Sequence, residues 1–336
     1  MKKRKELLFA AALLLTAALL LNFASDVLRP VRLDYGSTWS AFRAEPRDSL
    51  DVLYLGSSYA YCDINPSLIY AQTGLTGFVL AGSEQPLSIT YWYLREALRT
   101  QSPRAVLIEG TSLFFDTYQN YTQINVGYMP FSLNKLGAIF TASEPELRPG
   151  LLFDLYFYHT RWKEVGLSDI QRALTPAQPD HYKGYTAIDQ VQEGVGIAPY
   201  VGDRKVDPQV YAENLEWLDK ILALCEENGI QPIVAFHPTY TRCTRETYAR
   251  IEAEVRALDP DALFYNWSEE FESIGLTPTT DLYDGGHLNQ DGAAVFSPWL
   301  GDLLVEEAGL TPRPQSENNA AAWTESAARW REFLAG

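Results

Sequence analysis

Asp51-Val-Leu-Tyr-Leu-Gly-Ser-Ser58 is a short apolar run that ends in a glycine and two serines. A run of this length, closed by a turn residue, is typical of a strand buried in a parallel sheet. Four further runs have the same form, at residues 77–81, 105–108, 232–236 and 262–265. Together these runs predict the strands of one sheet.

Helical patterns alternate with the apolar runs. The clearest helix is expected over residues 208–228, because Asp207 can cap it, Pro208 suits its first position and Gly229 can stop it. Strands that alternate with helices predict an α/β fold, a flavodoxin-like doubly wound parallel sheet with helices on both faces. We assign the two halves of this domain to residues 29–110 and 207–310.

Residues 111–206 interrupt the alternation. Between Thr111 and Trp162 there are twelve Phe, Tyr or Trp residues, in a segment too long for a simple crossover. We interpret 111–206 as an aromatic-rich helical insertion or lid; the simpler alternative is that these aromatics only pack the insertion's own core. Residues 311–336 are expected to form a C-terminal helix that docks on the domain rather than on a membrane surface. Its apolar face comprises Trp323, Ala327, Trp330 and Leu334.

Residues 1–28 have the pattern of a basic tail and a transmembrane helix. Four basic residues, 2–5, precede Leu7–Phe23, an apolar run about 26 Å long as a helix. The basic cluster should stay in the cytoplasm, which predicts a single-pass protein of the cell membrane with an extracytoplasmic C-terminal domain. A retained anchor is favoured over a cleaved signal peptide because no small-x-small site follows the run. A buried helix of a cytosolic protein is the weaker alternative.

Charge and cysteine content exclude several classes of function. The net charge is −16. Residues 1–29 hold five basic and two acidic side chains, so the rest of the chain has a net charge of −19 and should repel nucleic acid. Three cysteines allow one Cys225–Cys243 bridge, with Cys62 left free, and do not form a disulfide framework. Zinc-type spacing is absent, so we predict neither a metal nor a cofactor.

Two separated motifs point to nucleophilic catalysis. Loops at the carboxyl ends of parallel strands usually hold the reactive groups, and Ser58 follows the first strand there. Asp284-Gly-Gly-His287 places a carboxylate three residues before an imidazole, a spacing that lets it orient the ring. Taken singly, each motif could be an ordinary turn. Taken together, they predict a catalytic triad of Ser58, His287 and Asp284.

These motifs resemble those of the SGNH (GDSL-like) hydrolase family. Gly56-Ser57-Ser58 looks like the first conserved block of the family, with Ser57 in place of the usual aspartate. Asp284-x-x-His287 matches the D-x-x-H signature of the fifth block. Gly82 falls where the second block has its oxyanion glycine. The resemblance implies that the backbone N–H groups of Ser58 and Gly82 hold the oxyanion.

One block departs from the family pattern. The third block normally supplies an asparagine, whereas the loop after the third strand here reads Glu109-Gly-Thr-Ser112. Gln85 and Thr111 are the candidates to replace the missing donor and to contact substrate.

The predicted anchor together with Gly-Ser-Ser is similar to one branch of the family, which includes the D-alanyl transfer protein of teichoic-acid modification and exported enzymes that modify surface polysaccharides. This similarity implies an esterase or O-acyltransferase, an acylated cell-surface glycan or polymer as substrate, and a membrane-bound acyltransferase partner. A non-catalytic SGNH-like protein that binds glycan or forms an envelope scaffold is the alternative. A phospholipase or thioesterase is a third reading.

Two further residues are candidates for substrate binding. His237 follows the fourth strand at the same sheet edge, without an acidic residue at a suitable spacing, and could make a polar contact or bind substrate. Asp63 is expected only to cap the turn after Ser58. Arg161, in Tyr158-His-Thr-Arg-Trp162, could pair with a substrate anion or form a structural salt bridge.

Overall fold

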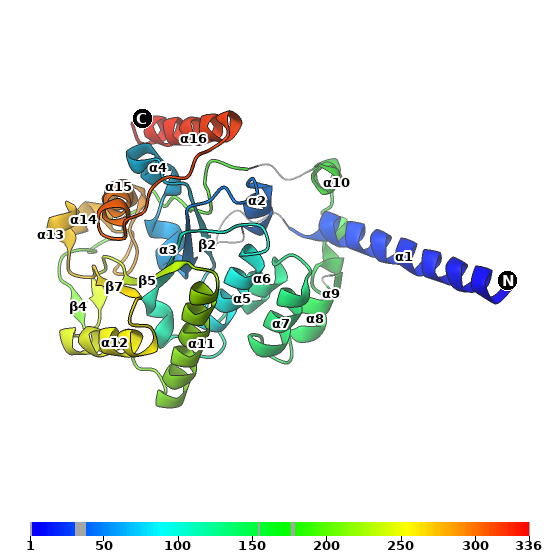
Figure 1. Ribbon diagram of the computed structural model, residues 1–336, viewed down its shortest axis with the longest axis horizontal. Coiled ribbons are helices and arrows are strands. Elements are labelled where there is room, and N and C mark those ends of the chain that lie inside the picture. The colour runs from blue at the N-terminus through cyan, green and yellow to red at the C-terminus, as the bar shows by residue number, and fades with distance from the viewer. Residues whose placement is uncertain (1, 31–37, 154, 176–178, 336) are drawn as a thin grey trace.

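A five-stranded parallel sheet forms the centre of the protein (Figure 1). The computed structural model describes residues 2–30, 38–153, 155–175 and 179–335. The strand order is β2-β1-β3-β5-β7, and every neighbouring pair is parallel. The strands are β1 (Val52–Gly56), β2 (Gly77–Ala81), β3 (Ala105–Glu109), β5 (Gln231–Phe236) and β7 (Leu263–Asn266). This order is the 2-1-3-4-5 order of flavodoxin-like sheets, and all five predicted strands are confirmed.

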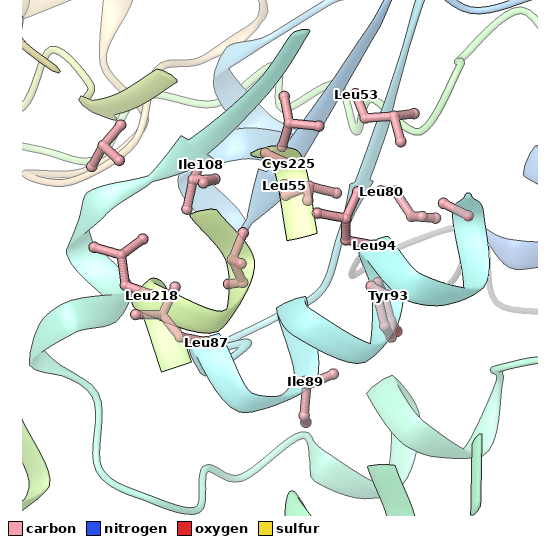
Figure 2. Close-up of a cluster of buried hydrophobic side chains, with 14 of the residues drawn as sticks. Leu53, Leu55, Leu80, Leu87, Ile89, Tyr93, Leu94, Ile108, Leu218 and Cys225 are labelled. Atoms are coloured by element: carbon pink, nitrogen blue, oxygen red, sulfur yellow. The ribbon is translucent and has the colours of Figure 1, made fainter. Parts of the chain in front are cut away.

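Helices cover both faces of the sheet, because alternate residues of each strand point to opposite sides. Leu53 and Leu55 of β1 belong to a buried cluster with α5 (Leu87–Ala97) and α11 (Pro208–Glu227), as Figure 2 shows. Val52 and Tyr54 belong to the cluster on the other face. The helices packed there are α3 (Ser58–Asp63), α4 (Pro66–Thr73), α13 (Phe271–Ile274) and α15 (Gln290–Glu306). The predicted doubly wound arrangement is therefore confirmed.

Helix ends follow the capping residues in the sequence. The Asp207 carboxylate accepts a hydrogen bond from the Gln209 N–H at 2.8 Å, and α11 begins at Pro208. Gly229 has a φ of +65°, a backbone conformation that favours glycine at a helix end. The same logic applies to α12 (Arg245–Leu258), which starts after a Thr244 cap. Capping residues thus determine where α11 starts and stops and where α12 starts.

Between β3 and α11, the described residues form short helices and one two-residue strand. Six of the twelve aromatic residues from 111 to 162 are exposed, and Phe114 is buried in the same cluster as Leu53 and Leu55, so a core of the segment's own does not account for all of them. The elements are η1 (Gly110–Phe114), α6 (Thr122–Gly127), α7 (Leu133–Thr141), α8 (Arg148–Leu152), α9 (Leu155–Tyr158), η2 (His159–Lys163), α10 (Leu167–Leu174) and β4 (Tyr200–Val201). Strand β4 pairs with β6 (Thr241–Arg242) in a separate two-stranded sheet, a connection to the second half of the domain that was not expected from the sequence.

The two ends of the chain behave differently. Helix α1 (Lys2–Leu28) projects away from the domain (Figure 1) and is long and apolar enough to cross a membrane. Helix α16 (Glu317–Ala335) docks on the domain as predicted, packing against α4 with Trp323 and Trp330 buried. Two short helices complete the domain, α2 (Trp39–Ala44) and α14 (Pro278–Asp281).

The three cysteines are buried and unpaired. A Cys225–Cys243 bridge is therefore not formed, and Cys225 instead packs in the core on α11. Burial raises the pKa of the Cys225 thiol to about 12, which keeps it protonated and unreactive.

Candidate active site

The first part of the site is the turn between β1 and α3. Gly56, the last residue of β1, has a φ of +141° and lies so close to β3 that an added Cβ would be 2.5 Å from the Glu109 Cβ. Only glycine fits this position without strain. The Ser57 hydroxyl donates to the Glu109 carboxylate at 2.9 Å, and this hydrogen bond holds the turn against the end of β3. Ser58 is then the first residue of α3, half-buried at the carboxyl edge of the sheet.

The second part is the loop before α15. An isolated antiparallel bridge between Leu282 and Leu288 closes this loop. Within it, the Asp284 carboxylate accepts the backbone N–H of Gly286 at 2.7 Å and that of His287 at 2.8 Å. The same carboxylate lies 2.9 Å from His287 Nδ1. The acidic side chain thus shapes the loop as well as orienting the imidazole.

The two parts meet across 229 positions of sequence. Ser58 Oγ lies 2.7 Å from His287 Nε2. Because Nδ1 faces a carboxylate, which only accepts, Nδ1 holds the proton and Nε2 is free to accept the serine proton. The predicted contacts among Ser58, His287 and Asp284 are therefore present in the structure.

Electrostatics around the imidazole favour its protonated form. Burial alone would lower the pKa of His287, but the hydrogen bond and charge of Asp284, with smaller contributions from Asp63 and Glu109, outweigh it and raise this pKa. Burial likewise opposes the charge on Asp284, yet the hydrogen bonds from His287 and Gly286 leave its pKa lowered. The imidazole can therefore take up a proton while Asp284 stays ionised.

An aromatic ring supports the imidazole from one side. Tyr59 stacks on His287 with ring centroids 4.7 Å apart and an angle of 26° between the planes. The Tyr59 hydroxyl accepts a hydrogen bond from the Arg204 guanidinium at 2.8 Å. An added Cβ at Gly286 would lie 2.9 Å from this hydroxyl, so the second glycine of the motif makes room for the ring. Neither Tyr59 nor Arg204 was expected from the sequence.

A second, fully buried pair lies behind the triad. The Asp63 carboxylate is 3.0 Å from His237 Nδ1 and accepts the Leu288 N–H at 2.9 Å. Asp63 therefore does more than cap a turn, and His237 does have an acidic partner; both sequence interpretations were wrong on these points. Since Leu288 follows His287, this carboxylate connects the end of α3 to the histidine loop.

The protonation of this pair follows from its neighbours. His237 Nδ1 also lies 3.1 Å from the Tyr59 carbonyl oxygen, which only accepts, so Nδ1 holds the proton. Burial lowers the pKa of His237 to about 4, and the imidazole is neutral. Burial raises the pKa of Asp63, while the His287 charge and the Leu288 N–H oppose that change. His237 does not line the cleft described below, which removes it as a substrate-binding candidate.

The structure also corrects the predicted oxyanion donors. The Gly82 N–H donates to the Gly56 carbonyl at 3.3 Å, so this N–H is already occupied, contrary to the prediction. The Gln85 amide donates to Thr90 at 2.9 Å, and the Thr111 N–H donates to Glu109 at 2.6 Å. Gln85 and Thr111 lie outside the lining of the cleft. Within the described part of the chain, the Ser58 N–H has no hydrogen-bond acceptor.

Arg161 likewise takes the structural role rather than the substrate-binding one. Its guanidinium donates to the Asp169 carboxylate and to the Leu28 carbonyl, both at 3.1 Å. The predicted structural salt bridge, between Arg161 and Asp169, is therefore confirmed, and the hydrogen bond to Leu28 connects Arg161 to α1.

A cleft of about 1660 Å³ opens over the triad. Ser58 and His287 lie in its lining together with Ser83 and Tyr61, whose hydroxyls are 2.7 Å apart. At the other end, the lining reaches Arg29, at the end of α1. A serine–histidine pair in a cleft of this size suits nucleophilic attack on an extended substrate.

Comparison with known proteins adds no family assignment. No family model matches the chain, and no curated protein matches it.

Proposed function

We propose that this protein is an extracytoplasmic serine esterase or O-acyltransferase of the SGNH type. The observation that supports this proposal is the Ser58 Oγ–His287 Nε2 distance of 2.7 Å, with Asp284 on the other ring nitrogen. Asp-His-Ser contacts of this kind activate a serine for attack on a carbonyl carbon. The anchor role of α1 and its orientation are part of the same proposal.

The reaction would proceed in two balanced steps. Ser58 Oγ attacks the acyl carbonyl carbon while its proton passes to His287 Nε2; the ester bond then breaks and His287 returns the proton to the leaving alcohol. In the second step, a water or sugar hydroxyl gives its proton to His287 and attacks the carbonyl carbon of the acyl-enzyme; the bond from that carbon to Ser58 Oγ then breaks, and His287 returns the proton to Ser58 Oγ. Asp284 stabilises the imidazolium in both steps. Water as acceptor gives an esterase, and a glycan hydroxyl gives a transferase.

The oxyanion site must differ from the family pattern. The Ser58 N–H is available as a first donor, whereas the Gly82 N–H is bonded to Gly56. Ser83, the next residue, lies in the cleft lining with its hydroxyl against Tyr61. We therefore assign the second donor to the Ser83 hydroxyl, which can turn toward developing negative charge because Tyr61 can act as its donor or acceptor.

The substrate class follows from the resemblance and the cleft. An acylated cell-surface glycan or polymer fits an extended cleft outside the membrane, and a membrane-bound acyltransferase is the expected partner that supplies or receives acyl groups. The alternative, a non-catalytic glycan-binding or scaffold protein, is favoured by the occupied Gly82 N–H and the missing asparagine.

A serine-reactive fluorophosphonate probe distinguishes these functions. The detergent-solubilised full chain should be labelled, and Ser58→Ala should abolish labelling. Ser102→Ala, at an exposed serine far from the site in sequence and structure, is the matched control and should be labelled normally. A folded wild-type protein that is never labelled would support the non-catalytic alternative.

A further inference from the structure

A group of exposed apolar side chains surrounds the base of α1. We call this group the collar. Its members extend from the end of α8 to the end of α10, and each is exposed by 64% or more. They are Phe153, Tyr156, Trp162, Leu167 and Leu174. Side chains of this kind usually mark a surface that is covered in the working protein.

Specific contacts hold the collar to the anchor helix. Figure 1 shows α9 and α10 on either side of the base of α1, and α1 contacts both of them and η2. The Arg172 guanidinium donates to the Arg29 carbonyl at 2.9 Å, and Arg161 donates to the Leu28 carbonyl. Both arginines also pair with Asp169. The collar is therefore attached at a defined position along α1.

The burial pattern of α1 sets the depth of the collar. Residues 3–23 are exposed, burial begins at Ala24, and Val27 is 8% exposed. Val27 lies four positions after Phe23, the end of the apolar run, which corresponds to about 6 Å along a helix. The headgroup layer of a bilayer is about 5–7 Å thick on each side. If the apolar run fills the hydrocarbon core, the segments that contact Val27 to Arg29 lie at the depth of the headgroups.

We propose that the collar lies in the headgroup layer of the bilayer that α1 enters. Tyr and Trp are favoured at this depth because one part of each ring system is apolar and the other hydrogen-bonds. The Lys163 ammonium, 5.7 Å from the Trp162 ring centroid, can reach lipid phosphates from the same place. This inference rests on the membrane-anchor part of the proposed function and is independent of catalysis.

The collar also narrows the substrate class. The cleft that contains Ser58 and His287 extends to Asp26, Arg29 and Pro30 at the base of α1. A collar at headgroup depth places this end of the cleft at the membrane surface. The acyl donor would then be a molecule held in the membrane, whose acyl group enters along the cleft from that side.

Labelling at single introduced cysteines tests the position of the collar. The native cysteines are buried, so a thiol-reactive NBD fluorophore reports the introduced site. Trp162→Cys and Leu167→Cys would be made in the full chain, reconstituted in phosphatidylcholine vesicles that contain lipid with a nitroxide near the headgroup. Ala257→Cys on α12, exposed and far from α1 in Figure 1, is the matched control. Leu14→Cys, near the middle of the apolar run, reports insertion of α1 in matched vesicles whose lipid has the nitroxide at the middle of the acyl chain.

The expected result is quenching at positions 14, 162 and 167 that is at least threefold stronger than at 257. Quenching at 14 with water-like emission at 162 and 167 would overturn the collar proposal alone. Absence of quenching at 14 would overturn the anchor as well. If neither the lipid nitroxide nor aqueous iodide quenched the fluorophore at 162 and 167, the collar would be covered by a second copy of the chain, and the proposal would be refuted.

A charged variant tests the substrate class separately. Trp162→Glu should disfavour seating of the collar and lower hydrolysis of p-nitrophenyl palmitate in vesicles by 10-fold or more, with hydrolysis of soluble p-nitrophenyl acetate unchanged. If the variant hydrolysed each of the two esters as fast as the wild type does, entry of the acyl group from the membrane would be refuted. Absence of any hydrolysis by the wild type would instead refute the enzymatic function.

Discussion

Substitution of Asp63 by asparagine tests whether the buried pair positions the triad. Each carboxylate oxygen of Asp63 accepts one N–H, from Leu288 at 2.9 Å and from His237 at 3.0 Å. An amide of the same shape has only one acceptor oxygen, so its NH₂ must face one of these donors. Moving the His237 proton from Nδ1 to Nε2 would avoid that clash but would leave the Tyr59 carbonyl without its donor.

The size of the effect follows from the lost contact. A buried hydrogen bond to a charged acceptor contributes about 1.5–3 kcal/mol. At about 2–4 °C per kcal/mol for a domain of this size, the melting temperature should fall by about 3–12 °C. Asp63 connects the end of α3, whose first residue is Ser58, to the loop that contains His287. Loss of this contact should therefore also lengthen the Ser58–His287 distance. A displacement of about 1 Å lowers kcat about 100-fold, so we expect a fall of 10- to 100-fold with little change in KM.

The assay combines thermal unfolding of the detergent-solubilised full chain with ester hydrolysis over a range of pH. Asp63 contributes to the raised pKa of His287, so Asp63→Asn should also shift the acidic limb of the activity profile to lower pH. Asp219→Asn, an exposed carboxylate on α11, is the control and should change none of these quantities. A lower melting temperature with unchanged kcat and pH profile would refute the positioning role, and an unchanged melting temperature would refute the energetic argument.

One pH dependence and three substitutions probe the site further. Catalysis needs neutral His287 and the pKa of His287 is raised, so kcat/KM should increase with pH through a midpoint above 6.5. The stability that the protonated His287–Asp284 pair contributes should be lost over the same pH interval. A midpoint of the activity profile below 6.5 would contradict this. Asp284→Asn should move that midpoint down and lower kcat about 10⁴-fold, measured by the same pH–rate profile. Gly286→Ala should displace the Tyr59 side chain, whose hydroxyl oxygen would lie 2.9 Å from the new Cβ, and lower kcat without loss of folding by circular dichroism. Ser83→Ala should lower kcat by about 10²-fold with labelling of Ser58 retained, and wild-type kcat would exclude it as an oxyanion donor.

The sheet could be predicted because its strands are local patterns. The runs after Asp51, Thr76 and Arg104 are apolar at every position, as expected for strands that helices cover on both faces. Capping residues such as Asp207 fixed the helix starts for equally local reasons. The motif Asp284-Gly-Gly-His287 was readable because its key contact spans only three residues.

The other parts of the site depend on contacts between distant segments. The sequence distance between Asp63 and His237 gives no periodic signal, although α3, which ends at Asp63, and β5, which His237 follows, meet at the same sheet edge. The same is true of Arg204 and Tyr59. The Gly82 error has a different origin: the register of β1 and β2 places this N–H against the Gly56 carbonyl, and register is not visible in either strand alone.

The wide separation of Ser58 and His287 has a consequence for biosynthesis. If the chain is exported as proposed, it crosses from its amino-terminal side, so Ser58 would emerge long before His287, and the serine would have no base until the loop before α15 had also crossed. Under the proposed function, a chain that stalls during translocation would therefore be catalytically silent. The order of the motifs along the polypeptide would protect acyl groups inside the cell and confine the chemistry to fully translocated molecules.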